Sequence, residues 1–216
     1  MNKLLAEFLG TFALVFAGTG AIVINHASGG AIGHVGIAFT FGLIVLAMIY
    51  TFGEVSGAHL NPAVTLGFFA ASRFEAKNVG PYILTQCLGA LAASGVLRFL
   101  FPADKTLGAT LPAGSALQSF ILELILTFFL MLVILRVSTG AKEKGITAGI
   151  VVGAVIALEA MFAGPICGAS MNPARSLAPA VVSGHTEHLW VYLVATVLGA
   201  VLAVPVCPLL EPREKA

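Results

Sequence analysis

The chain has 216 residues, of which 58% are hydrophobic and 10% charged, and its formal net charge is +1. A water-soluble domain carries about 25% charged residues, so this chain lacks the polar cover that a water-facing surface needs. The apolar content excludes a disordered chain and the near-zero net charge excludes a basic face for nucleic acid, so we expect a protein whose partner is the lipid bilayer.

Six apolar segments are long enough to cross a membrane as helices, since a hydrocarbon core of about 30 Å takes roughly 20 helical residues. They are about 4–25, 35–53, 79–100, 117–137, 146–166 and 188–209. The first could instead be a signal peptide, but Glu7 interrupts it and it continues to about Asn25, which favours a membrane span. Two shorter apolar segments, 61–71 and 172–183, reach only about half of a bilayer. We expect them to be re-entrant half-helices.

The two halves of the chain repeat each other. GAHLNPAV at 57–64 matches GASMNPAR at 168–175, and AEFLGTF at 6–12 parallels LELILTF at 122–128. Because each half has three spans and one half-length segment, the second copy must lie upside down relative to the first. The predicted fold is an all-α membrane protein with six transmembrane helices and two re-entrant half-helices. It forms a single domain (1–216) of inverted repeats, about 1–108 and 117–216, which places the working site near the midplane.

The lysine and arginine residues predict the orientation of the chain in the membrane. If both termini are cytoplasmic, the inner side holds Lys3, Arg73, Lys77, Arg136, Lys142, Lys144, Arg213 and Lys215, and the outer side holds Arg98, Lys105 and Arg175. This asymmetry follows the positive-inside rule. We therefore expect a multi-pass protein of the cell membrane with both termini in the cytoplasm.

Two equivalent triplets begin the half-length segments: Asn61, Pro62 and Ala63, and Asn172, Pro173 and Ala174. Asparagine is a favoured N-cap and proline suits the first helical position, so each triplet is expected to start a half-helix. Two such N-termini meeting at the midplane each carry about half a positive charge. At about 4 Å and an effective dielectric constant near 20, the pair repels a unit cation by about 4 kcal/mol. The pattern predicts a narrow path for neutral molecules whose oxygens accept hydrogen bonds from the Asn amides.

The doubled triplet, the six spans and an acidic residue in the first span of each half resemble the aquaporin (major intrinsic protein) family over nearly the whole chain. The stretch MFAGPICGASMNPARS is similar to the nodulin-like intrinsic proteins of plants and their bacterial relatives. This resemblance implies a passive channel with one pore per subunit, a homotetramer, and no cofactor, metal site or enzymatic activity. It places a selectivity filter, called the filter below, at Phe41, Ala160, Ala169 and Arg175.

The filter residues give a mixed indication of the substrate. Strict water channels carry histidine at the position of Ala160, so a methyl group there and at Ala169 implies a wider filter. Such a filter favours small uncharged solutes such as glycerol, urea or metalloid acids in addition to water. By contrast, Ser176 and Ala180 resemble the water channels.

Four further residues are candidates for supporting roles. Glu7 and Glu123 occupy equivalent places in the repeat and are expected to accept N–H groups from the re-entrant loops. Glu159 has no counterpart: it either modulates the pore, as an acceptor near the filter or a partner of Arg175, or is a protonated or interhelically bonded residue. His59 either lines the inner mouth of the pore, where it could gate with pH, or is a packed loop histidine.

Two other functional classes are open to this sequence. The first is an ion-coupled secondary transporter of a small solute, since such transporters also use inverted repeats and broken helices. The second is an adhesive or scaffolding membrane protein with a closed pore. An enzyme is disfavoured because no paired carboxylates, activated nucleophile or metal cluster can be recognised.

Overall fold

The computed structural model describes residues 2–138 and 142–210. Arg213, Lys215 and the C-terminus, which enter the predicted orientation, lie outside these residues. The described chain is helical, and its longest connection between helices is residues 101–115. The helices are α1 (Asn2–Ala27), α2 (Gly33–Ser56), α3 (Pro62–Ala70), α4 (Ala76–Leu100), α5 (Ala116–Val137), α6 (Lys142–Cys167), α7 (Pro173–Ser183) and α8 (Leu189–Val206), followed by a 3₁₀ turn (Cys207–Leu210).

Six of these helices are long and apolar enough to cross a membrane, and α3 and α7 are the two short ones. This confirms the predicted fold class, and the predicted segments match the helices to within a few residues. The last span differs in detail. It was expected to run as one helix to about residue 209, but the α-helix ends at Val206 and a 3₁₀ turn follows. Pro208 has no N–H with which to continue the α-helical hydrogen bonding.

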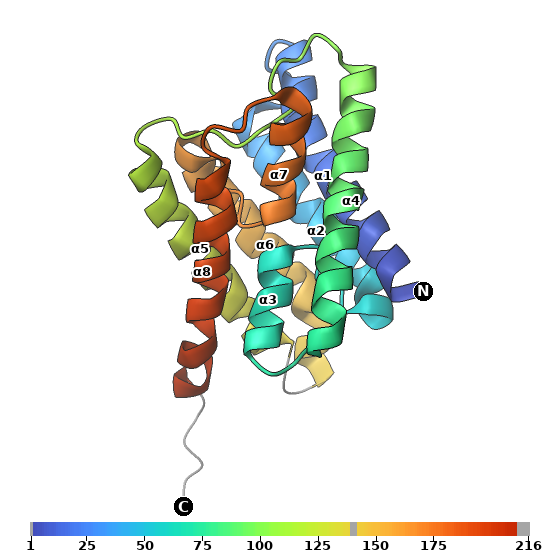
Figure 1. The fold of residues 1–216 in the computed structure, drawn as a ribbon, viewed down its shortest axis with the longest axis vertical. Coiled ribbons are helices and arrows are strands. Elements are labelled where there is room, and N and C mark those ends of the chain that lie inside the picture. The colour runs from blue at the N-terminus through green and yellow to red at the C-terminus, as the bar shows by residue number, and fades with distance from the viewer. Residues whose placement is uncertain (1, 139–141, 211–216) are drawn as a thin grey trace, which may run out of the picture.

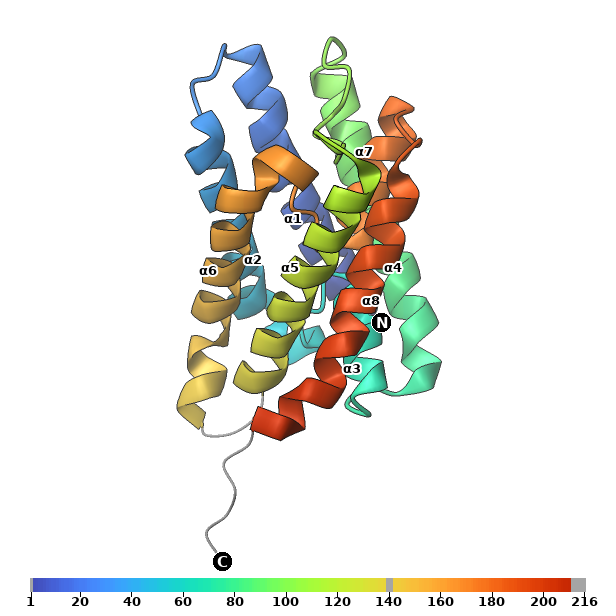
Figure 2. The ribbon, with the colours of Figure 1, turned by 90° about the vertical axis from the view of Figure 1, so that its left-hand side faces the viewer.

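The two short helices lie one above the other inside the bundle, α7 in its upper half and α3 in its lower half (Figures 1 and 2). Around them α1 packs on α4, α5 packs on α8, and α2 packs on α6. The first two pairs approach closely at matching glycines. A Cβ on Gly89 of α4 would lie 2.3 Å from the carbonyl oxygen of Phe8, and a Cβ on Gly199 of α8 would lie 2.3 Å from that of Leu124. Glycine thus allows backbone contact between the paired helices.

The outer surface of the long helices is apolar. Large hydrophobic side chains are exposed on α2, α4, α5, α6 and α8, among them Phe39, Leu43, Leu84, Leu88, Phe129, Leu158, Phe162 and Trp190. By contrast, several polar side chains are fully buried, including Glu7, Gln86 and Glu123. An exterior of this kind suits hydrocarbon rather than water, and it leaves the polar groups in the interior around α3 and α7.

Candidate functional site

The half-helices α3 and α7 begin in the way that their sequences predict. Asn61 caps α3, and its side-chain oxygen accepts a hydrogen bond from the amide of Ala63 at 2.8 Å. Asn172 caps α7 and accepts from the amides of Ala174 at 3.0 Å and Arg175 at 3.3 Å. A proline follows each asparagine at the first helical position, where no N–H is needed. The N-terminal amides of both half-helices therefore face the middle of the bundle.

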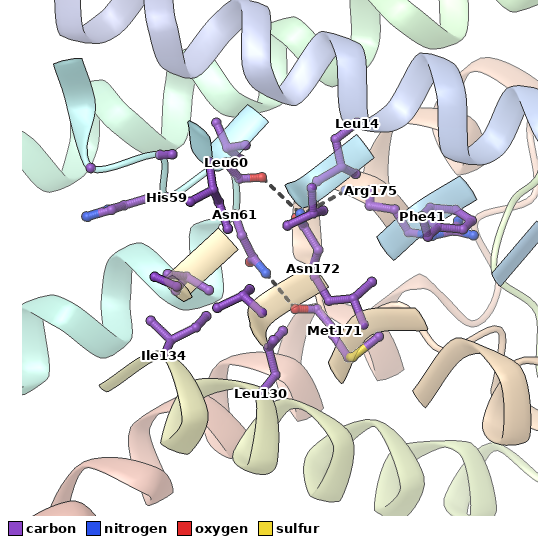
Figure 3. A pocket seen from close by; sticks show the side chains of 18 of the residues that line it. Leu14, Phe41, His59, Leu60, Asn61, Leu130, Ile134, Met171, Asn172 and Arg175 are labelled. Atoms are coloured by element: carbon purple, nitrogen blue, oxygen red, sulfur yellow. Dashed lines mark hydrogen bonds between the residues drawn. The ribbon is translucent and has the colours of Figure 1, made fainter. Parts of the chain in front are cut away.

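The two asparagines also connect the two halves of the chain. Asn61 Nδ2 donates to the carbonyl oxygen of Met171 at 2.7 Å, and Asn172 Nδ2 donates to that of Leu60 at 2.9 Å (Figure 3). Both side chains line the same cavity. A side-chain amide carries two N–H groups, and this exchange uses one of each pair. From the sequence we expected these amides to donate to a solute; in the structure one N–H of each amide bonds the opposite loop, which leaves the other N–H for a solute.

Two buried carboxylates hold the loops that lead into the half-helices. Glu7 accepts hydrogen bonds from the amides of His59 at 3.0 Å and Leu60 at 2.7 Å, and further ones from Ser56 and Gln86. Glu123 does the same for the second loop, with the amides of Ser170 at 2.8 Å and Met171 at 2.9 Å. The loops need this support, because their backbone N–H groups are not bonded within a helix and are buried in the interior of the bundle.

The backbone of both loops is also strained in the same pattern. Ala58 and Leu60 in the first loop have φ values of +45° and +51°, and Ala169 and Met171 in the second have +41° and +53°. Side chains with a Cβ disfavour this left-handed region. The carboxylates of Glu7 and Glu123 therefore stabilise a conformation that the loops would not adopt alone.

Two cavities lie along the interior, and they meet at the filter. One, which we call the inner cavity, is about 120 Å³ and is lined by Asn61 and Asn172, whereas the other, which we call the outer cavity, is about 380 Å³. Phe41 and Arg175 border both cavities, Ala160 borders the outer one and Ala169 the inner one. Of the four residues that the resemblance assigned to the filter, Phe41 and Arg175 thus separate the two spaces, and Ala160 and Ala169 lie on opposite sides of them.

Arg175 is held at the boundary between these two cavities. Its guanidinium donates to the carbonyl oxygen of Gly108 at 2.8 Å and lies 4.8 Å from the centre of the Phe41 ring. The side chain is only 2% exposed, and its Nε is buried without a hydrogen-bond partner among the described residues. Arg175 therefore places a fixed, buried positive charge beside both cavities; such a charge repels a cation, and its N–H groups can donate to a neutral acceptor.

A chain of hydroxyl groups runs beside Arg175 from the outer cavity to the inner one. Thr110, which lines the outer cavity, donates to Ser176 at 2.8 Å, and Ser176 shares a hydrogen bond with Ser170, which lines the inner cavity. In the sequence, Ser176 is recognisable only by its resemblance to water channels, and neither Thr110 nor Gly108 is recognisable as part of the site. Backbone carbonyls and loop hydroxyls form no recognisable sequence pattern. They come together here only because the loop between α4 and α5 folds over α7.

His59 and Glu159 were both considered as modulators of the pore. His59 lines the inner cavity and is packed as well: its ring stacks on Phe68 at 4.7 Å, and its Nδ1 lies 3.1 Å from Thr65 Oγ1. Glu159 is buried but lines neither cavity, and the described residues include no ion pair between it and Arg175. Neighbouring helical residues point about 100° apart, so α6 can present Ala160 to the path while Glu159 faces elsewhere.

The chain is similar to several known proteins. A family model described as Major intrinsic protein matches residues 1–206. Aquaporin NIP1-1 of Zea mays is 48% identical over 202 residues, covering 93% of this chain and 72% of the relative. Nodulin-26 of Glycine max is 45% identical, with coverage of 93% and 74%. Among solved structures, the aquaglyceroporin from Plasmodium falciparum matches with a TM-score of 0.87 and 30% identity, covering 96% of this chain and 97% of that one.

Proposed function

The chain belongs to the major intrinsic protein family, and on this premise we propose that it is a passive pore for water and small uncharged solutes that excludes ions and protons. The family assignment makes the chain an aquaporin-type membrane channel and not an enzyme. The solutes that pass, the assembly and the orientation are the parts that we propose here.

One observation carries the proposal: two interior cavities approach each other at Phe41 and Arg175. A solute that moves between them must pass the guanidinium and then the two asparagines of the inner cavity. At about 4 Å and an effective dielectric constant near 20, Arg175 repels a unit cation by about 4 kcal/mol. The two half-helix N-termini add a repulsion of similar size. Because about 1.4 kcal/mol is a factor of ten in rate, these charges support strong discrimination against cations and protons.

The lining of the path favours a solute with both polar and apolar faces. Leu14, Val45, Leu130, Ile134 and Val152 contribute an apolar wall to the inner cavity, and Asn61, Asn172 and Arg175 contribute the donors. A small polyol can place its hydroxyl oxygens toward the donors and its carbon chain against the apolar wall. The small Ala160 and Ala169 leave room for it at the filter. The similarity to the structure of an aquaglyceroporin supports glycerol as a solute. We include urea and metalloid acids because they too are small and uncharged.

The test is a stopped-flow comparison of water, glycerol, urea and arsenite entry into liposomes that contain the purified protein. We expect liposomes with the protein to shrink faster than empty liposomes, and we expect this water flux to have a low activation energy. Glycerol should also enter them faster than it enters empty liposomes. Water and glycerol rates equal to those of empty liposomes would refute the proposal. Solute uptake that requires a proton or sodium gradient would instead support an ion-coupled transporter.

The same premise extends to the organisation of the protein. We propose that the halves, about 1–108 and 117–216, are inverted repeats, which the matching Glu7 and Glu123 contacts support. We also propose a homotetramer in the cell membrane with both termini cytoplasmic. Chemical crosslinking in native membranes tests the tetramer, and protease protection of tags at each end tests the orientation. If crosslinking yields only the monomer, the tetramer is refuted. If the tags lie on the outer face, the proposed orientation is refuted.

A further inference from the structure

The loop between α4 and α5 crosses the outer end of the bundle and supplies the carbonyl oxygen that anchors Arg175. That carbonyl belongs to Gly108, and Thr110 of the same loop is bonded to Ser176 of α7. The loop has no regular secondary structure. Its backbone must nevertheless aim one carbonyl oxygen at the guanidinium, so something else has to fix its conformation.

Asp104 fixes that conformation through a turn. Its Oδ1 accepts hydrogen bonds from the amides of Leu107 at 2.7 Å and Thr106 at 3.0 Å. The turn holds two successive residues in the left-handed region, Leu107 with φ +53° and Gly108 with φ +72°. Leucine disfavours this region because of its Cβ, so the aspartate bonds compensate for a local cost. The two left-handed residues direct the Gly108 carbonyl toward α7.

Neighbouring helices hold Asp104 and its turn in place. Asp104 Oδ2 lies 2.9 Å from His26 Nδ1 at the end of α1, and the Asp104 backbone carbonyl accepts from Arg98 of α4 at 2.7 Å. Leu107 is fully buried against Val23 of α1 and Leu97 of α4. Burial acts to raise the pKa of Asp104, but the hydrogen bonds from His26 and from the loop amides outweigh it and lower the pKa. The carboxylate is therefore kept charged, which strengthens the bonds that it accepts.

The close contact of Gly108 with α1 leaves little freedom for another backbone position at this residue. A Cβ on Gly108 would lie 2.9 Å from Cβ of Thr19, so the loop passes directly over α1 at this point. Without the turn at Asp104, Gly108 cannot keep both this approach and its bond to Arg175. The guanidinium would then lose its anchor, keep the Phe41 ring as its neighbour, and turn toward the lumen.

We propose that Asp104, fastened by His26, is a positioning residue that sets the filter by holding the Gly108 carbonyl against Arg175. The inference rests on the proposed channel function, because it concerns the selectivity of that pore. Asp104 acts through the loop and does not itself line either cavity. Its loss should obstruct a bulky solute more than water, because a displaced guanidinium occupies part of the cross-section that glycerol needs.

The test compares the ratio of glycerol to water permeability in liposomes for Asp104→Ala and for Lys105→Ala, an exposed neighbour in the same loop. Release of Arg175 from one hydrogen bond predicts a fall of about threefold to tenfold for Asp104→Ala. Lys105→Ala should keep the wild-type ratio. Asp104→Asn keeps the acceptor of the turn, so its ratio should stay within about twofold of wild type.

A double-variant cycle separates positioning from a general structural role. In an Arg175→Ala background the guanidinium is absent, so adding Asp104→Ala should not change the ratio further. An unchanged or raised ratio in Asp104→Ala, or an equal fall in the Arg175→Ala background, would overturn the inference.

Hydrogen exchange at the Leu107 amide gives a second measurement that needs no flux. Asp104→Ala should accelerate this exchange and Lys105→Ala should not, and equal protection in Asp104→Ala and wild type would also overturn the inference. If the wild type conducts no faster than empty liposomes, the proposed function fails, and this exchange still decides whether Asp104 holds the loop.

Discussion

Replacement of Gly18 by alanine should narrow the filter, because this glycine of α1 makes room for the Phe41 ring. A Cβ on Gly18 would lie 2.2 Å from Cε1 and 2.5 Å from Cδ1 of Phe41. Comfortable carbon–carbon contacts begin at about 3.5 Å, so ring and methyl group must separate by roughly 1.3 Å. The ring borders both cavities and faces Arg175, so the space available to it is the lumen.

The size of the effect follows from the energy of overpacking. An added methyl group in a packed site costs about 1–3 kcal/mol when neighbours must shift. A solute that needs the full cross-section must push the ring back against this strain. Because about 1.4 kcal/mol is a factor of ten in rate, glycerol permeability should fall about 5-fold to 150-fold. Water needs less room, so its permeability should fall by a smaller factor.

The assay is stopped-flow permeability of liposomes at equal protein content, with thermal unfolding as a check on the fold. Gly20→Ala is the matched control, since a Cβ there meets only Leu97 Cδ2 at the ordinary distance of 3.4 Å. In the double variant Gly18→Ala with Phe41→Ala, glycerol permeability should recover. Glycerol permeability that is unchanged in a well-folded Gly18→Ala, or lowered equally in Gly20→Ala, would refute the assignment of Phe41 to the constriction.

Four further predictions concern single groups. Arg175→Val should raise the leak of larger and charged solutes, because about 4 kcal/mol of repulsion is lost; dye and ion release from liposomes measures it, and an unchanged leak contradicts the filter assignment. Glu7→Leu leaves several buried donors without an acceptor and should destabilise the fold by at least about 3 kcal/mol, seen as a lower Tm. Glu159→Gln should give the same curve of permeability against pH as wild type, since Glu159 lines neither cavity; diverging curves would restore it as a modulator. Because the folded pKa of Asp104 lies below its ordinary value of 3.8, protection of the Leu107 amide should be full above that pH and should weaken as the pH falls through the lowered pKa, where the neutral acid remains a poorer acceptor; constant protection down to full protonation would contradict this.

The fold could be predicted from the sequence because membranes restrict the possible structures. A bilayer admits helices whose length and apolar content are directly visible in a sequence. The two half-helices were recognisable because Asn61 and Asn172 precede prolines at the start of short apolar segments. The C-terminal end of α8 was less predictable, because a change from α-helical to 3₁₀ hydrogen bonding has little effect on hydropathy.

The candidate site could be predicted only in part, and its side chains were easier to find than its backbone groups. Phe41, Ala160, Ala169 and Arg175 follow from a family resemblance, and each of them lines at least one of the two cavities. The groups that hold these side chains in place could not be recognised in the sequence. Backbone carbonyls such as that of Gly108 occur at every residue, so nothing in the sequence marks the one that anchors Arg175. The role of Asp104 depends on left-handed backbone at Leu107, which a leucine gives no reason to expect.

The exchange of bonds between the two asparagine caps has a consequence for how the polypeptide is made. Until residues 171 and 172 have left the ribosome, the Asn61 amide and the Leu60 carbonyl lack the partners that they have in the finished protein. A polar group without a hydrogen-bond partner is costly in hydrocarbon. The first loop should therefore stay in a hydrated environment, such as the insertion machinery or the bilayer surface, until its partners are made. The centre of the pore would then assemble late in biogenesis, when the second loop arrives and supplies the hydrogen-bond partners of the first.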